Sequence, residues 1–203
     1  MTRPATATYP SQEELLSAQS PFDWIDRNFL RCDPFAFRSS DFQAFALTCS
    51  DSLGVDPNGV FCIGSAAVGL SLNPGKILEG RLKQFDINSD LDVALISEVH
   101  FERAWRSLRS QAHPAIVGEM EQELVDAMGH QRKRFFDGAI LANKLLPYLD
   151  FGAEWVTSMV RVSEVAARAL DREIDVNCWI YRDYWSVRSY VANGMIKCRE
   201  HLR

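Results

Sequence analysis

The stretch that decides the fold spans residues 60–97. It reads VFCIGSAAVGLS at 60–71 and, after a polar segment, NSDLDVALIS at 88–97. The apolar runs Val60–Ile63 and Leu91–Ile96 are short and continuous, which predicts two buried strands. The first strand ends at Gly64-Ser65, where a short helix is expected to begin. Alternation of strands and helices in this order indicates an α/β protein.

The rest of the chain predicts mostly helices and one more strand. Apolar residues at helical spacing predict helices over Ser40–Leu53, Glu98–Arg109, Ile116–Leu149 (with interruptions), Trp155–Leu170 and from Tyr184 to Leu202. Strict alternation over 173–181 predicts a third strand. We therefore expect an α/β (α+β) fold, with a small mixed sheet of three or more strands flanked by helices. A single domain, 1–203, would have its core at about 55–110 and 170–203 and a helical insertion at about 114–170.

Composition narrows the possible functions. The chain has 203 residues, and 47% of them are hydrophobic, which favours a folded globular protein over a disordered one. Its formal net charge of −5 argues against a protein that binds long duplex DNA, because such proteins are usually basic. Neither a membrane-spanning segment nor a secretory signal is evident. The five cysteines have no paired spacing, so we expect reduced thiols in a cytoplasmic protein.

Two carboxylates stand at the start of the second predicted strand. Asp90 and Asp92 are two residues apart, so an extended chain places both on one face while Leu91 and Val93 face a core. Neighbouring carboxylates repel each other unless a cation lies between them. Magnesium suits such a pair, because it binds carboxylate oxygens together with substrate phosphates. The sequence therefore predicts that Asp90 and Asp92 bind Mg²⁺ or Mn²⁺.

A third carboxylate is expected on the strand predicted over 173–181. Asp175 lies between apolar residues, as Asp92 does, and shares its face with Trp179. If this strand lies beside the second strand, Asp175 meets Asp90 and Asp92 across the pair. The alternative is a surface carboxylate on an edge strand.

The junction after the first strand predicts a phosphate site. It exposes backbone N–H groups and the positive end of a helix dipole. Gly64 allows the backbone to approach a ligand closely, and the Ser65 hydroxyl adds a donor. Lys76, Arg81 and Lys83 follow on the long polar segment and are candidate contacts for a triphosphate. The alternative is that they are solvated charges of a tolerated surface loop.

Together these motifs resemble the signature of the DNA polymerase β-like nucleotidyltransferase superfamily. Its elements are Gly-Ser at a strand-to-helix turn, here Gly64-Ser65, then Asp-x-Asp before an apolar strand, here Asp90 and Asp92, and a distant Asp, here Asp175. The similarity is greatest to small stand-alone bacterial nucleotidyltransferase-domain proteins. It is strong over about 60–110 and weaker over 170–195. The segment between Ser65 and Asp90 is longer than in minimal members.

The resemblance implies a nucleotidyltransferase core and a two-metal reaction. Asp90, Asp92 and Asp175 would be the metal ligands and catalytic residues, and Gly64 and Ser65 would hold the outgoing phosphates. The substrate would be a nucleoside triphosphate, with ATP favoured. A hydroxyl acceptor would attack the α-phosphorus in line and release pyrophosphate.

The acceptor stays open between a protein, an RNA and a small molecule such as an aminoglycoside. The resemblance also suggests a phage-defence or toxin–antitoxin setting, in which a small chain works with a protein partner. The alternative function is a non-catalytic nucleotide-sensing or interaction subunit that uses the same fold without turnover. The presence of three carboxylates in the expected order favours the enzyme.

Overall fold

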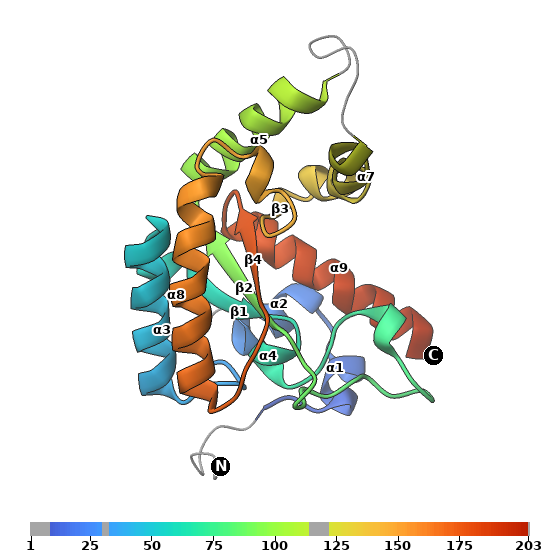
Figure 1. Cartoon of the computed structure of the whole chain (residues 1–203). Helices are drawn as coiled ribbons and strands as arrows, with labels where there is room; N and C mark the ends of the chain where they lie inside the picture. Colours follow the sequence, from blue (N-terminus) through green and yellow to red (C-terminus); the bar gives the residue numbers. More distant parts are fainter. Residues whose placement is uncertain (1–8, 30–32, 114–121, 203) are drawn as a thin grey trace.

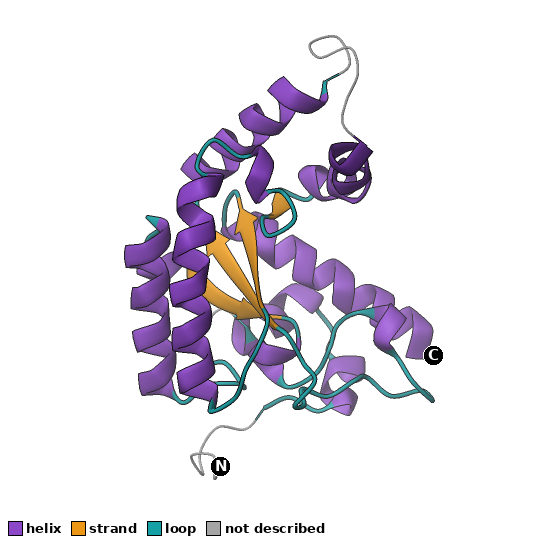
Figure 2. Ribbon diagram, viewed as in Figure 1, coloured by secondary structure: helices purple, strands orange, loops and turns teal. Residues whose placement is uncertain are grey.

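The centre of the computed structural model is a four-stranded mixed sheet with strand order β1-β2-β4-β3 (Figure 2). The structure describes residues 9–29, 33–113 and 122–202. β2 pairs with β1 in antiparallel and with β4 in parallel orientation, and β3 pairs with β4 in antiparallel orientation. The strands are β1 (Val60–Ile63), β2 (Leu91–Ile96), β3 (Ala139–Leu141) and β4 (Val176–Tyr181).

Helices cover both faces of the sheet (Figure 1). α3 (Ser39–Leu53) and α8 (Gly152–Leu170) run side by side over one face. α2 (Pro21–Asn28) and α9 (Tyr184–Leu202) pack together over the other face. The remaining helices among the described residues are α1 (Gln12–Ser17), α4 (Ser65–Val68), α5 (Glu98–Ala112) and α7 (Gln122–Phe136).

β2 is buried on both faces because it is a central strand with helices on either side. Leu91, Val93, Ala94 and Leu95 are all 0% exposed. Strands in this position are usually apolar throughout. Asp92 is therefore an exception in β2, because packing does not explain a half-buried carboxylate in this strand.

The predicted fold class is confirmed as α/β with a mixed sheet, and all three predicted strands are present. The third is shorter than expected, because β4 begins at Val176. The prediction of helix over Ile116–Leu149 was wrong for part of this range. α7 ends at Phe136 and is followed by the short strand β3 at the edge of the sheet. Residues 116–121 of that range lie outside the described residues.

The structure shows why β3 escaped the sequence pattern. Three residues are too few to show alternation, and Ala139 and Ile140 are both fully buried. The buried Gln131 of α7 supports the strand on its open side. Its Nε2 donates to the Ala139 carbonyl (2.7 Å), and its Oε1 accepts from the Leu141 N–H (3.2 Å). The segment expected as a helical insertion thus contributes the fourth strand.

Two further expectations concern the whole chain. None of the helices in the described ranges is long and apolar enough to cross a membrane. Cys49, Cys62, Cys178 and Cys198 are buried free thiols, as expected, whereas Cys32 lies outside the described residues.

Candidate functional site

The Gly64-Ser65 turn lies directly against Asp92. In the antiparallel pairing of β1 with β2, Ile63 is opposite Asp92, so the turn follows at the same end of the sheet. Gly64 has φ +64° and ψ −147°, a conformation that is essentially restricted to glycine. A Cβ at this position would also lie 3.2 Å from Asp92 Oδ2. The structure therefore brings the two halves of the sequence motif together, and the turn requires glycine.

Asp90 and Asp92 are joined by a residue that the sequence argument did not select. Asn177 of β4 is paired with Asp92 across the parallel strands. Its Nδ2 donates to Asp90 Oδ2 (3.1 Å) and to Asp92 Oδ1 (3.2 Å). The indole Nε1 of Trp179 donates to the same Asp92 oxygen (3.1 Å). Both side chains fix the carboxylate pair on the face of the sheet that α9 covers.

The charge on Asp92 is unfavourable in this environment. Burial raises the pKa of Asp92, and the nearby charge of Asp90 raises it further. The hydrogen bonds from Trp179 and Asn177 oppose this rise, and so does the positive charge of Lys76. Lys76 Nζ lies 3.9 Å from Asp90 Oδ1. A carboxylate pair with this pKa shift favours an additional cation, which would offset the repulsion.

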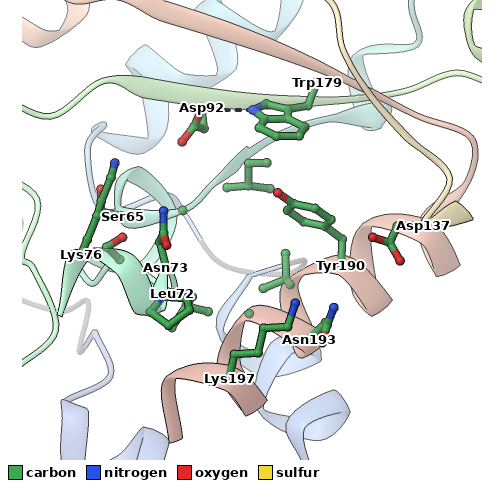
Figure 3. A pocket seen from close by; sticks show the side chains of 16 residues that line it. Ser65, Leu72, Asn73, Lys76, Asp92, Asp137, Trp179, Tyr190, Asn193 and Lys197 are labelled. Atoms are coloured by element: carbon green, nitrogen blue, oxygen red, sulfur yellow. Dashed lines mark hydrogen bonds between the residues drawn. The ribbon is translucent and has the colours of Figure 1, made fainter. Parts of the chain in front are cut away.

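A cavity of about 390 Å³ opens beside Asp92 (Figure 3). Lys76 comes from the loop after α4, and Lys197 comes from the last turns of α9. The rings of Trp179 and Tyr190 line the side of the cavity opposite Lys76. The polar and charged lining residues are Ser65, Ser71, Asn73, Lys76, Asp92, Asp137, Asn193 and Lys197.

Several of these residues were missed at the sequence level. Asn193 and Lys197 lie on α9 among the apolar positions that bury its other face, and nothing in their spacing marks them. Tyr190 was equally unmarked. Asn177 could have been found, because alternation already placed it on the face of Trp179. The prediction did not include Asn177, because it considered only carboxylates as metal ligands.

The three basic residues of the long loop have different surroundings. Lys76 lines the cavity. Lys83 lies 3.8 Å from Asp86 in an ion pair. Arg81 lines a separate hollow with Tyr9 and forms a backbone bridge with Leu78. Only Lys76 of the three is therefore placed for a ligand in the cavity.

Asp175 directly precedes β4, next to the Leu91–Val176 pair of the parallel strands, and it is exposed. The Leu91 N–H donates to its carbonyl (2.8 Å). It lines a second, open hollow that it shares with Asp90 and Asn177. Within the described residues, no group of three or more His, Cys, Asp or Glu side chains is arranged to hold a metal ion.

The residues present nevertheless fit a magnesium ion that arrives with a nucleotide. Mg²⁺ is commonly bound through one or two carboxylates together with substrate phosphates, and it needs no all-protein cage. Asp90 and Asp92 supply the carboxylates, and their repulsion supplies the electrostatic reason. The helix dipole expected after Gly64 contributes little, because α4 has only four residues.

Comparisons of the chain with protein-family models, with curated proteins and with solved structures found no match. The resemblance to polymerase β-like nucleotidyltransferases therefore stays a prediction from the residues themselves.

Proposed function

We propose that the chain is a metal-dependent nucleotidyltransferase that moves a nucleoside monophosphate from a nucleoside triphosphate to a hydroxyl acceptor. One observation carries the proposal. A glycine turn that requires glycine is held against Asp92 at a cavity that also contains Lys76 and Lys197. Packing alone does not explain a half-buried carboxylate pair at the start of a central strand, because burial and mutual repulsion both disfavour the two charges.

The donor nucleotide occupies the cavity in this proposal. Lys76 and Lys197 contact the phosphates, together with the first backbone N–H groups of α4, which have no acceptor within the helix. Ser65 adds its hydroxyl. Asp90 and Asp92 would hold Mg²⁺ together with the phosphates. When bound, the ion would neutralise phosphate charge and favour ionisation of the acceptor hydroxyl.

The acceptor approaches from the open rim of the sheet. Its oxygen forms a bond to the α-phosphorus while the bond from that phosphorus to the bridging oxygen breaks, and pyrophosphate leaves with that oxygen. The hydroxyl proton passes to a carboxylate at the rim. Asp175 is the residue that we assign to this step, because it is exposed and lines the same hollow as Asp90.

A label-transfer experiment tests the proposal. The purified protein is mixed with Mg²⁺ or Mn²⁺ and each of the four α-³²P-labelled nucleoside triphosphates, with protein, RNA or small-molecule fractions of a cell extract as acceptors. The D90N/D92N double variant is run in parallel, with D51N of the exposed face of α3 as the charge control. We expect label in one fraction, lost in the double variant and kept in D51N. Equal labelling by the wild type and the double variant would refute the assignment.

A second candidate function is a nucleotide-binding subunit without turnover. Asn177 favours it, since an amide occupies the position that faces both carboxylates. This candidate predicts Mg²⁺-dependent nucleotide binding by calorimetry and no release of pyrophosphate with any acceptor. Pyrophosphate release that depends on Asp175 would rule it out.

A further inference from the structure

The wall of the cavity farthest from Lys76 is built by the segment that follows α7. Asp137 lines the cavity there, immediately before Gly138 and β3. Figure 3 shows Asp137 beyond the Tyr190 ring, on the side away from Lys76 and Ser65. Asp137 thus lines the cavity at the end opposite Lys76 and Ser65, with the Tyr190 ring between them.

Asp137 is held in a fixed position. Gly138 has φ +68°, and a Cβ there would overlap the side chain of Ser186 on α9. The Gly138 N–H donates to the Phe135 carbonyl (3.1 Å), and its own carbonyl accepts from the Arg182 N–H (3.0 Å). The turn that carries Asp137 is therefore pinned against the start of α9.

The Asp137 carboxylate is half-buried and has no hydrogen bond or ion pair with any residue in the described ranges. Its neighbour in the cavity, Tyr190, packs against Trp179 at 5.4 Å between ring centroids. Arg134 lies over the other part of this cluster, 5.0 Å from the Trp179 ring centroid. A carboxylate only accepts hydrogen bonds, so the free acceptor faces a ligand that must donate.

The bases differ in the donors that they can offer to a carboxylate. Guanine presents N1–H and the N2 amino group side by side, so one carboxylate accepts both. Adenine and cytosine present an amino group next to a ring nitrogen lone pair, which repels the second carboxylate oxygen. Uracil presents one N–H between two carbonyls. Tyr190 offers an aromatic face to any of them and selects none.

We infer that Asp137 selects guanine, so that the donor nucleotide is GTP rather than ATP. This inference rests on the proposed function, because it takes the cavity as the site of the nucleotide. It deepens that function by naming the residue that recognises the base. The alternative contact of Asp137 is the ribose diol, which would not distinguish the bases.

Calorimetric binding of non-hydrolysable GTP, ATP, CTP and UTP analogues with Mg²⁺ tests the inference. We expect wild-type protein to bind the GTP analogue at least about tenfold more tightly than the others, as one bidentate base contact gives. D137N places an amide donor and acceptor where adenine offers an acceptor and a donor. We expect it to lose the GTP preference and to bind the ATP analogue more tightly than wild type does.

The controls separate this inference from the proposed function. D126N removes one negative charge from the exposed face of α7 and should leave all four affinities unchanged. Y190L should weaken all four analogues alike, and thermal unfolding shows whether each variant is folded. Equal affinities in wild type, or an equal loss of all four in D137N, would overturn guanine selection and leave the nucleotide site standing. Absence of binding by any analogue would overturn both.

Discussion

The starts of the parallel strands β2 and β4, here called the β2 rim and the β4 rim, lie at the same end of the sheet and carry aspartates that differ in burial. At the start of β2, Asp90 and Asp92 are half-buried and accept hydrogen bonds from Asn177, and Asp92 also accepts one from Trp179. At the start of β4, Asp175 is exposed, and within the described residues its carboxylate has no partner. Hydrogen bonds hold the carboxylates of the β2 rim in place, whereas the carboxylate of the β4 rim is exposed to solvent.

The comparison teaches what alternation can and cannot establish. Residues two apart on a strand share a face, which predicts that Asp175 and Asn177 lie on the same face. The depth of each residue depends on where the strand begins and what covers it. Because β4 begins at Val176, Asn177 lies within the strand, whereas Asp175 precedes it and is bound to β2 through its backbone carbonyl.

The largest expected effect is a difference between the Asp92 and Asp175 variants in their affinity for nucleotide. D92N should weaken Mg²⁺-dependent nucleotide binding by at least about 30-fold, because removing one partner of a close charge interaction costs roughly 2–5 kcal/mol. D175N should bind nucleotide like wild type and lose label transfer. Calorimetry and the transfer assay measure the two properties separately. A D175N variant that transfers normally would leave no chemical role for the β4 rim.

The next effect tests the amide between the carboxylates. N177D replaces a donor to Asp90 and Asp92 with a third negative charge, so we expect the free energy of unfolding to fall by about 1–3 kcal/mol without metal. Added Mg²⁺ should restore more stability to N177D than to wild type, since three carboxylates attract it more strongly. Denaturant unfolding with and without Mg²⁺, at roughly 5–10 mM, measures this difference in stabilisation. An identical response to Mg²⁺ in both proteins would show that Asn177 does not face the cation.

The glycine turn offers an effect of the same size, with a matched control. G64A should lower the free energy of unfolding by about 1–3 kcal/mol, because Ala is strained at this φ and ψ. It should also weaken nucleotide binding, since the new Cβ would press on Asp92. G54A, at another left-handed glycine that ends α3, should cost about 1–2 kcal/mol and leave binding unchanged. Equal binding by both variants would separate the turn from the site.

The smallest effect is a pH dependence at Asp92. Its pKa is raised in the folded protein, so the protonated form stabilises the fold. That contribution is fully present below the ordinary value of 3.8 and is lost as pH rises through the raised pKa. D92N carries no charge, so it should be more stable than wild type at pH 7, with the gap closing as pH falls. Thermal unfolding of both proteins, in steps of about one pH unit between about pH 3 and about pH 7, measures this difference in stability. A constant gap would assign the stability difference to another cause.

Much of the site could be predicted because its signals are local. Asp90 and Asp92 share a face by strand geometry, and Gly64 ends a strand where the chain must turn, so both follow from neighbours in the sequence. Lys197 and Asp137 could not be predicted in this way. Each belongs to a different element, and only the packing of α9 and β3 against the sheet brings them to one cavity.

By itself, the sequence determined the α/β class, the buried strands, the glycine turn after the first strand and the two carboxylates at the start of the second. These features depend on periodicity and on backbone freedom over a few neighbouring residues, which the local sequence specifies without contacts to distant segments. Only the tertiary structure decided that β3 joins the sheet, that Asn177 rather than Asp175 bridges Asp90 and Asp92, and that Lys197 faces Lys76 across a cavity. These features depend on burial and on contacts between distant segments, which local pattern does not encode.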